Sequence, residues 1–216
     1  MSGPWIAAHE AEPIPGLPGR LPEGEAILWQ GTPRWHSFAR YGFHLPQFAL
    51  YFALLLAWYV AESLAAGTAS GTALLLGTAR LAGLAAAALV LLAGLAALVA
   101  RTTLYTITTR RVVMRVGMAL PITLNLPFRL IDSAGVRLRA DGSGDIALTL
   151  AAGERVAFVT LWPHVRPWHF ARPVPMLRAL PDAAQVAAVL GRALSLRAYA
   201  PQRNAVAPAA ARAVAA

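Results

Sequence analysis

The sequence contains no cysteine and no lysine. Without cysteine, a disulfide framework and a thiolate-bound zinc or iron–sulfur centre are excluded. All 19 basic residues are therefore arginine. Charge is also scarce, at 13% of 216 residues, whereas 57% are hydrophobic. This composition is typical of a chain that is partly embedded in a membrane.

The motifs of the common enzyme classes are missing as well. No nucleophile elbow, P-loop, dinucleotide fingerprint or HExxH pattern occurs. His164 and His169 have no acidic residues near them in the sequence, so no zinc site is predicted. His36 and His44 flank the first apolar run, where they could ligate a tetrapyrrole or form interfacial hydrogen bonds. We therefore expect no enzyme, no catalytic residue and no metal.

Two long apolar runs are the main features that are present. Leu81–Ala100 is 20 residues without a charge, and such a helix covers the roughly 30 Å hydrocarbon core of a bilayer. Leu45–Ala61 is 17 residues, near the short limit. A cleaved signal peptide is the alternative for this first run, but glutamates and prolines precede it and no basic segment opens the chain. We predict spans at about 45–63 and 79–100, which form a transmembrane hairpin over 45–100.

The arginines lie mainly outside this hairpin. Residues 101–216 contain 15 arginines and 5 acids, and Arg80 is the only basic residue between the two runs. The positive-inside rule then places both termini in the cytoplasm. The arginines predicted to lie at the membrane surface are Arg34, Arg40, Arg101, Arg110, Arg111 and Arg115.

These arginines have more than one interpretation. Beside a membrane, each adds about 1 kcal/mol of attraction to anionic lipid. They could instead meet the acidic face of a protein partner. Nucleic acid is a third possibility, but topology explains arginines beside a span more simply, so we expect no nucleic-acid partner.

The segment 1–44 is predicted to be an arm followed by an approach to the membrane. Prolines and glycines through residue 26 exclude regular elements, and 27–31 is a candidate short strand. Aromatic, basic and histidine residues mix over 35–44. That mixture indicates an amphipathic segment at the bilayer, or a loop packed on the soluble domain.

After Arg101 the apolar period changes to two, which predicts an antiparallel meander folded as a barrel or sandwich over 101–197. Asp182 to Gln185 fits a capping box, and an apolar stripe predicts a helix to about Leu196. We expect the tail 198–216 to be disordered. The alternating runs are 105–107, 112–116, 122–126, 136–138, 146–150 and 156–158.

Trp162, His164, Arg166 and Trp168 form the candidate partner-binding cluster. Exposed tryptophan and arginine are the residues that dominate binding energy at protein interfaces. The alternative is a loop tied down on the domain.

Several segments resemble known families. The segments 21–31 and 105–112 resemble bacterial membrane-anchored pleckstrin-homology (PH) proteins. Asn125 to Phe128, Asp141 to Ile146 and Leu161 to Trp168 are similar to the photosynthetic complex assembly proteins of the PuhB type. The match covers most of residues 12–196, and the tryptophan and proline run is its specific part.

The resemblance implies an α+β membrane protein whose hairpin is followed by a seven-stranded PH-like barrel with a C-terminal helix. It implies a multi-pass protein of the bacterial inner (intracytoplasmic) membrane, with both termini and the PH-like domain cytoplasmic. The implied role is assembly of the photosynthetic reaction centre and core light-harvesting complex through transient protein–protein contacts.

The resemblance also implies partners and leaves alternatives open. The implied partners are reaction-centre and core antenna subunits and membrane lipids, and homo-oligomerisation stays open. It supplies no cofactor, although contact with bacteriochlorophyll is conceivable. The inositol phosphate site of eukaryotic relatives is not carried over, because the lysine-rich pattern is missing. A lipid-binding or envelope-stress membrane protein with the same fold is the alternative function.

Overall fold

The computed structural model divides the chain into two units. One unit is Arg34–Ala100, and the other combines Met1–Pro33 with Arg101–Ala216. The residues that the structure describes are 16–17, 19–67, 70–117, 122–151 and 156–196, without the side chains of 159 and 160. The predicted disordered tail 198–216 lies outside them.

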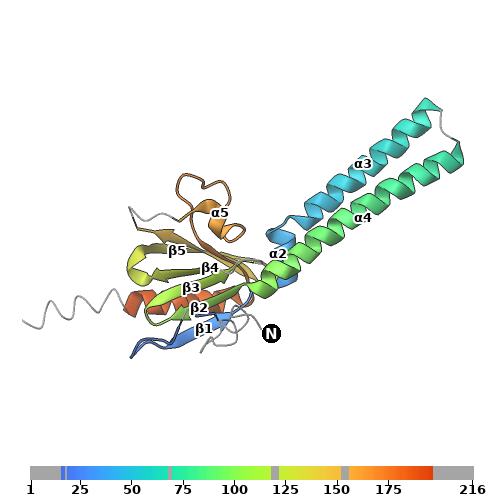
Figure 1. The fold of residues 1–216 in the computed structure, drawn as a ribbon. Helices are drawn as coiled ribbons and strands as arrows, with labels where there is room; N and C mark the ends of the chain where they lie inside the picture. The colour runs from blue at the N-terminus through green and yellow to red at the C-terminus, as the bar shows by residue number, and fades with distance from the viewer. Residues whose placement is uncertain (1–15, 18, 68–69, 118–121, 152–155, 197–216) are drawn as a thin grey trace, which may run out of the picture. The chain divides into compact units, whose positions relative to one another are not determined.

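The unit Arg34–Ala100 is helical (Figure 1). It contains α2 (Trp35–Tyr41), α3 (Leu45–Ala66) and nearly all of α4 (Gly71–Thr102). α3 and α4 are long and apolar enough to cross a membrane, with mean hydropathies of 1.7 and 2.5. Their apolar side chains are mostly uncovered by protein, which suits a lipid environment. Both helices extend beyond the predicted spans, because the Ala- and Leu-rich sequence continues through the expected ends.

The predicted approach segment at 35–44 contains a short helix. Phe38 is buried in α2 and its ring lies 5.7 Å from that of Phe43, whereas Trp35 is half exposed. Pro46 stands in the first turn of α3, where its missing N–H has no helical acceptor. Gly67 ends that helix at a positive φ of 61°.

The other unit holds two antiparallel sheets (Figure 1). The expected α+β class with antiparallel strands is confirmed, but the strands do not close into the predicted barrel. β4 ends at Pro127, which lacks an N–H for further pairing, and the short 3-10 turn η1 leads into the second sheet. The first sheet has the order β1 (Ile27–Gly31), β2 (Leu104–Thr108), β3 (Arg111–Val116) and β4 (Ile122–Pro127), and the second has β5 (Ile131–Leu138), β6 (Gly144–Leu150) and β7 (Met176–Leu180).

One predicted strand is wrong. Residues 156–158 do not form a strand, and Phe158–Leu161 is instead the short helix α5. The third strand of the second sheet is β7, which pairs with β6 from Gly144 to Ala147. All five β7 residues are buried, so the strand lacks the alternation by which the others were predicted.

The first strand precedes the two long helices in the sequence, whereas the other six strands in the described part of the chain follow them. β1 was predicted as a short strand and is one, but the sequence did not indicate its partner. It pairs antiparallel with β2, from Ile27 opposite Thr108 to Gly31 opposite Tyr105. The Gln30 side-chain amide also donates to Thr106 Oγ1 at 2.9 Å. The sheet is therefore completed by residues that the predicted domain 101–197 does not include.

The C-terminal helix Ala183–Leu196 packs its apolar stripe on the sheets. Ala183, Val186, Leu190 and Ala193 are buried in the same core as Tyr105. Asp182 precedes the helix with a φ of 50°, outside the extended conformation of a capping-box residue. Its carbonyl oxygen accepts hydrogen bonds from the N–H groups of residues 185 and 186 and so starts the helix.

Candidate functional site

The tryptophan loop, residues 161–175, is fixed to the domain by His164. Only 1% of His164 is exposed. Its Nδ1 lies 2.6 Å from the Tyr105 hydroxyl, and its Nε2 lies 3.1 Å from Thr103 Oγ1. The His164 carbonyl accepts a hydrogen bond from the N–H of Met176 in β7. The loop is thus attached to the residues that directly follow α4.

Burial sets the charge of this anchor. Burial, together with the nearby Arg178 guanidinium, lowers the pKa of His164 to about 3, so the imidazole is neutral at pH 7. Burial also raises the pKa of the Tyr105 hydroxyl and lowers the pKa of Arg178. Arg178 donates to the carbonyl of Pro163 at 3.0 Å and so holds a second point of the loop.

The outer side of the tryptophan loop is aromatic and basic. Trp162 is 53% exposed, Trp168 is 85% exposed, and the Arg166 side chain is exposed. The Phe170 ring lies 6.3 Å from that of Trp168 and 4.7 Å from that of Phe158. Three of the four candidate partner-binding residues are therefore accessible, and the fourth, His164, is the buried anchor. The loop is therefore anchored to the domain through His164 and exposed at its tryptophans.

The candidate membrane-surface arginines fall at different places. Arg115 pairs with Leu104, the first residue of β2, near the end of α4, where Arg101 is exposed. Arg110 and Arg111 lie at the other end of the β2–β3 hairpin, about 17 Å away along the strand. The remaining two, Arg34 and Arg40, belong to the helical unit, and Arg40 lies over the ring of Tyr41.

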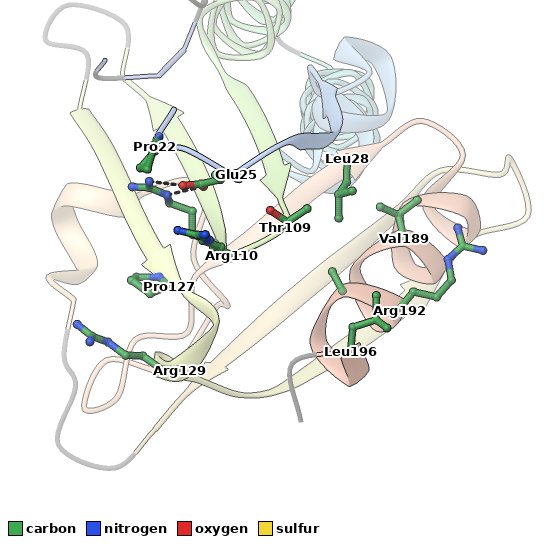
Figure 2. A pocket seen from close by; sticks show the side chains of 12 residues that line it. Pro22, Glu25, Leu28, Thr109, Arg110, Pro127, Arg129, Val189, Arg192 and Leu196 are labelled. Atoms are coloured by element: carbon green, nitrogen blue, oxygen red, sulfur yellow. Dashed lines mark hydrogen bonds and ion pairs between the residues drawn. The ribbon is translucent and has the colours of Figure 1, made fainter. Parts of the chain in front are cut away.

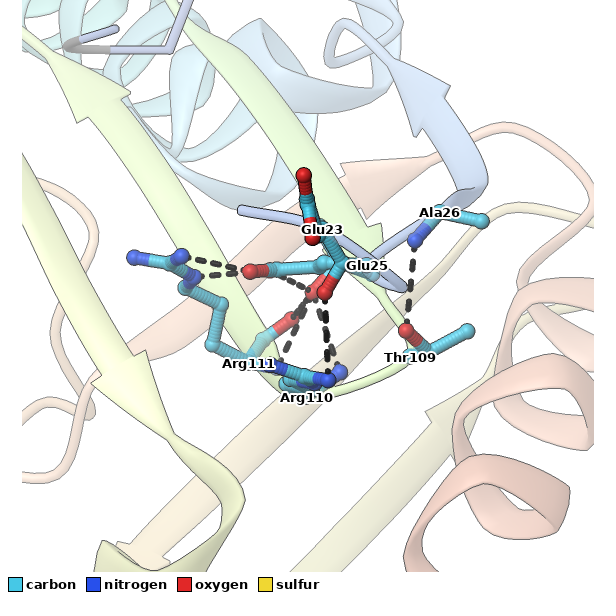
Figure 3. A network of polar contacts seen from close by, with 7 residues as sticks. Glu23, Glu25, Ala26, Thr109, Arg110 and Arg111 are labelled. Carbon is cyan, nitrogen blue, oxygen red and sulfur yellow. Dashed lines mark hydrogen bonds and ion pairs between the residues drawn. The ribbon is translucent and has the colours of Figure 1, made fainter. Parts of the chain in front are cut away.

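The buried carboxylate of Glu25, a residue before β1, lies against the β2–β3 turn (Figure 3). Glu25 Oε1 accepts hydrogen bonds from Arg111 Nε and Thr108 Oγ1, both at 2.7 Å, and Oε2 accepts one from Arg111 Nη2 at 2.5 Å. The Arg111 hydrogen bonds lower the pKa of Glu25, and the carboxylate raises the pKa of Arg111. Arg111 therefore has a structural role, because it neutralises the buried Glu25. Its role at the membrane surface stays a prediction.

An open cavity of about 940 Å³ lies beside this ion pair (Figure 2). Its walls come from β1 and the segment before it, the β2–β3 turn, the end of β4, η1 and the last turns of the C-terminal helix. Among the residues that the structure describes, no three metal-binding side chains cluster there or elsewhere. The lining residues are Pro22, Glu25, Leu28, Thr109, Arg110, Arg111, Pro127, Arg129, Val189, Arg192, Ala193 and Leu196.

Sequence reasoning missed this cavity as well as the anchor. Arg129 and Arg192 are 63 positions apart and carry no local motif, so only the folded chain brings them to one cavity. Tyr105 was predicted only as part of the strand run 105–107, and Thr103 had no predicted role. The alternation of the run 105–107 was the one sequence signal that the Tyr105 side chain is buried.

Comparison with known proteins gives two matches. A family model described as a bacterial PH domain matches residues 43–194. A protein of Rhodobacter capsulatus is 40% identical over 195 residues, which cover 88% of this chain and 89% of that protein. Its description reads "Uncharacterized 23.7 kDa protein in puhA 5'region". No solved structure matches.

Proposed function

The chain belongs to the bacterial PH domain family, and from that premise we propose that it is a membrane-anchored assembly factor of the PuhB type. It assists the photosynthetic reaction centre and its core light-harvesting complex through transient contacts with their subunits. The resemblance of the tryptophan and proline run supports this assignment. A relative described as a protein in the puhA 5' region also supports it, since the names puhA and PuhB have the same first three letters.

In this proposal α3 and α4 cross the inner membrane as a hairpin and anchor the protein there. Their length and hydropathy support two spans. Pairing of β1 with β2 requires both ends of the hairpin on one side of the membrane, which an even number of spans provides. Arginines at both ends and few between favour the cytoplasmic side. The domain then works at the cytoplasmic surface, with no resident cofactor and no catalytic step.

The observation that carries the function is the position of the tryptophan loop. His164 ties the loop to Thr103, which is the residue that directly follows α4. The anchor of the loop is therefore one residue beyond the end of the second candidate span. On this loop Trp162 and Trp168 present large apolar faces, beside the exposed Arg166. We propose that these faces contact cytoplasmic segments of membrane subunits. Exposed aromatic and arginine side chains are the residues that contribute most to such contacts.

The test replaces the chromosomal gene with variants. Trp162→Ala with Trp168→Ala, and separately Arg166→Ala, should lower reaction-centre and core-antenna absorbance toward that of a deletion strain. Bacteriochlorophyll synthesis should continue in both. Trp35→Ala is the matched control, because Trp35 is also half exposed but lies in α2 of the helical unit.

A second experiment identifies the partner directly. A photoreactive residue at position 162 or 168 should capture reaction-centre or antenna polypeptides in membranes, and one at position 35 should not. A deletion strain with normal amounts of both complexes counts decisively against the proposal.

The alternative function is a lipid-binding or envelope-stress membrane protein. One observation favours it, since exposed tryptophan and arginine also suit the headgroup region of a bilayer. In that case the loop variants should leave the photosynthetic complexes unchanged. They should instead alter growth under membrane stress in cells kept without photosynthesis.

A further inference from the structure

The cavity beside Glu25 has uncompensated positive charge. Four arginines and one glutamate line it. The glutamate is already engaged by Arg111, so Arg110, Arg129 and Arg192 are left. Among the described residues, no ion pair involves these three. The site therefore attracts a negatively charged ligand.

The rest of the cavity is apolar and accessible. Leu28 of β1 is 43% exposed and Leu196 of the C-terminal helix is 74% exposed, and Val189 lies between them in Figure 2. Leu28 and Leu196 are not covered by other parts of the described chain. A ligand with apolar groups would gain by covering them, at about 25 cal/mol for each Å² removed from water.

The arrangement of the charges distinguishes between ligand classes. In Figure 2, Arg129 and Arg192 lie on opposite sides of the cavity, with Leu196 between them and Leu28 and Val189 on the side of Arg192. A compact anion such as phosphate needs several donors that converge on one point. Separated arginines instead suit carboxylates that are spaced along an extended ligand.

We propose that this cavity binds an extended acidic segment of another polypeptide. Two carboxylates of the segment pair with Arg129 and Arg192, and an apolar side chain between them contacts Leu196. In an extended segment, residues i, i+2 and i+4 share one face, so alternate positions supply the acid, the apolar group and the second acid. This inference uses none of the tryptophan loop and can fail without affecting the proposed function.

The binding test uses the full chain in phosphatidylcholine nanodiscs, a neutral lipid surface. The probes are fluorescent peptides with a glutamate at each end and one, two or three Ser-Leu repeats and a serine between them. At least one spacing should bind, measured by fluorescence anisotropy. The same peptide with glutamine in place of glutamate should bind at least about tenfold more weakly.

Variants locate the binding. Arg129→Ala and Arg192→Ala should each weaken binding by about fivefold or more, because each removes one charged contact. Arg137→Ala is the matched control, since Arg137 is exposed on β5 and outside the cavity. It should leave binding within about twofold. Far-ultraviolet circular dichroism of each variant checks that the fold is kept.

Three results would overturn the proposal. The first is equal binding of the glutamate and glutamine peptides at every spacing. The second is an equal loss of binding in the Arg137→Ala control. The third is that inorganic phosphate, or phosphatidylglycerol in the nanodiscs, binds with the same dependence on Arg129 and Arg192 while no peptide does.

Discussion

The Tyr105 hydroxyl lies 2.6 Å from Nδ1 of His164, inside the core of the sheet domain. The N–H of Arg178 donates to the same hydroxyl at 3.1 Å. The hydroxyl can then give its own hydrogen to Nδ1, and His164 donates Nε2–H to Thr103. One neutral tautomer therefore satisfies the network from β2 through the loop to β7.

Tyr105→Phe should destabilise the domain by about 1–3 kcal/mol. The change leaves the N–H of Arg178 and Nδ1 of His164 buried without this partner, and an unsatisfied buried group costs that amount. The measurement is denaturant unfolding of the full chain in detergent, followed by near-ultraviolet circular dichroism. Tyr51→Phe, on the exposed surface of α3, should change stability by less than about 0.5 kcal/mol. An equal effect of both variants would contradict the role of the network.

Acid should destabilise the domain through His164. Its pKa is about 3 in the folded chain and about 6.5 in the unfolded chain, so folding favours the neutral ring. Its contribution is complete above pH 6.5 and decreases as the pH falls toward 3. The free energy of unfolding should fall between pH 6.5 and 5, with a slope that rises from about 0.7 kcal/mol per pH unit at pH 6.5 toward about 1.4 at pH 5. Carboxylates with lowered pKa values, such as Glu25, titrate below this range.

Two variants isolate this titration. His164→Asn should be less stable at pH 7 but should lose most of the slope between pH 6.5 and 5. His169→Asn removes an exposed histidine of the same loop and should keep the slope. A slope that persists in His164→Asn would assign the pH dependence to another group.

The predictable part of the fold was the part encoded locally. Alternation identified runs in β2 to β6, 27–31 was predicted as a short strand without it, and the apolar stripe identified the C-terminal helix. β7 was missed because it is buried along its whole length and follows Pro173 and Pro175. The pairing of Ile27–Gly31 with β2 was also missed, because no local pattern indicates a partner on the other side of two apolar helices.

The candidate site shows the same limit. Composition alone identified Trp162, Arg166 and Trp168, which the structure leaves exposed. It could not separate them from His164, because burial depends on contacts with Thr103 and Tyr105 some 60 residues away. Periodicity identifies the faces of an element, whereas a buried anchor depends on tertiary contacts.

The domain should fold in water when its first strand is kept and the hairpin is removed. Gly31 lies opposite Tyr105 in antiparallel strands, so a short Gly-Ser turn can replace residues 32–102 and keep Thr103, the partner of His164. Residues 16–31 joined in this way to 103–196 should give a soluble monomer with cooperative thermal unfolding. Residues 103–196 alone should aggregate or unfold without cooperativity, because the edge of β2 is then unpaired. Equal behaviour of the two chains would show that β1 is dispensable.

Both ends of the hairpin should be accessible from the cytoplasm and its tip from the periplasm. The pairing of Gly31 with Tyr105 joins a residue before α3 to one after α4, which the chain can achieve only if the two ends emerge on one side. The absence of cysteine makes single substitutions clean reporters. A membrane-impermeant maleimide should label Ser70→Cys in intact spheroplasts, but label Thr32→Cys and Ser195→Cys only after permeabilisation. Labelling of positions 32 and 195 from opposite sides would be incompatible with the β1–β2 pairing, whereas labelling of both from outside would keep the pairing and reverse the orientation.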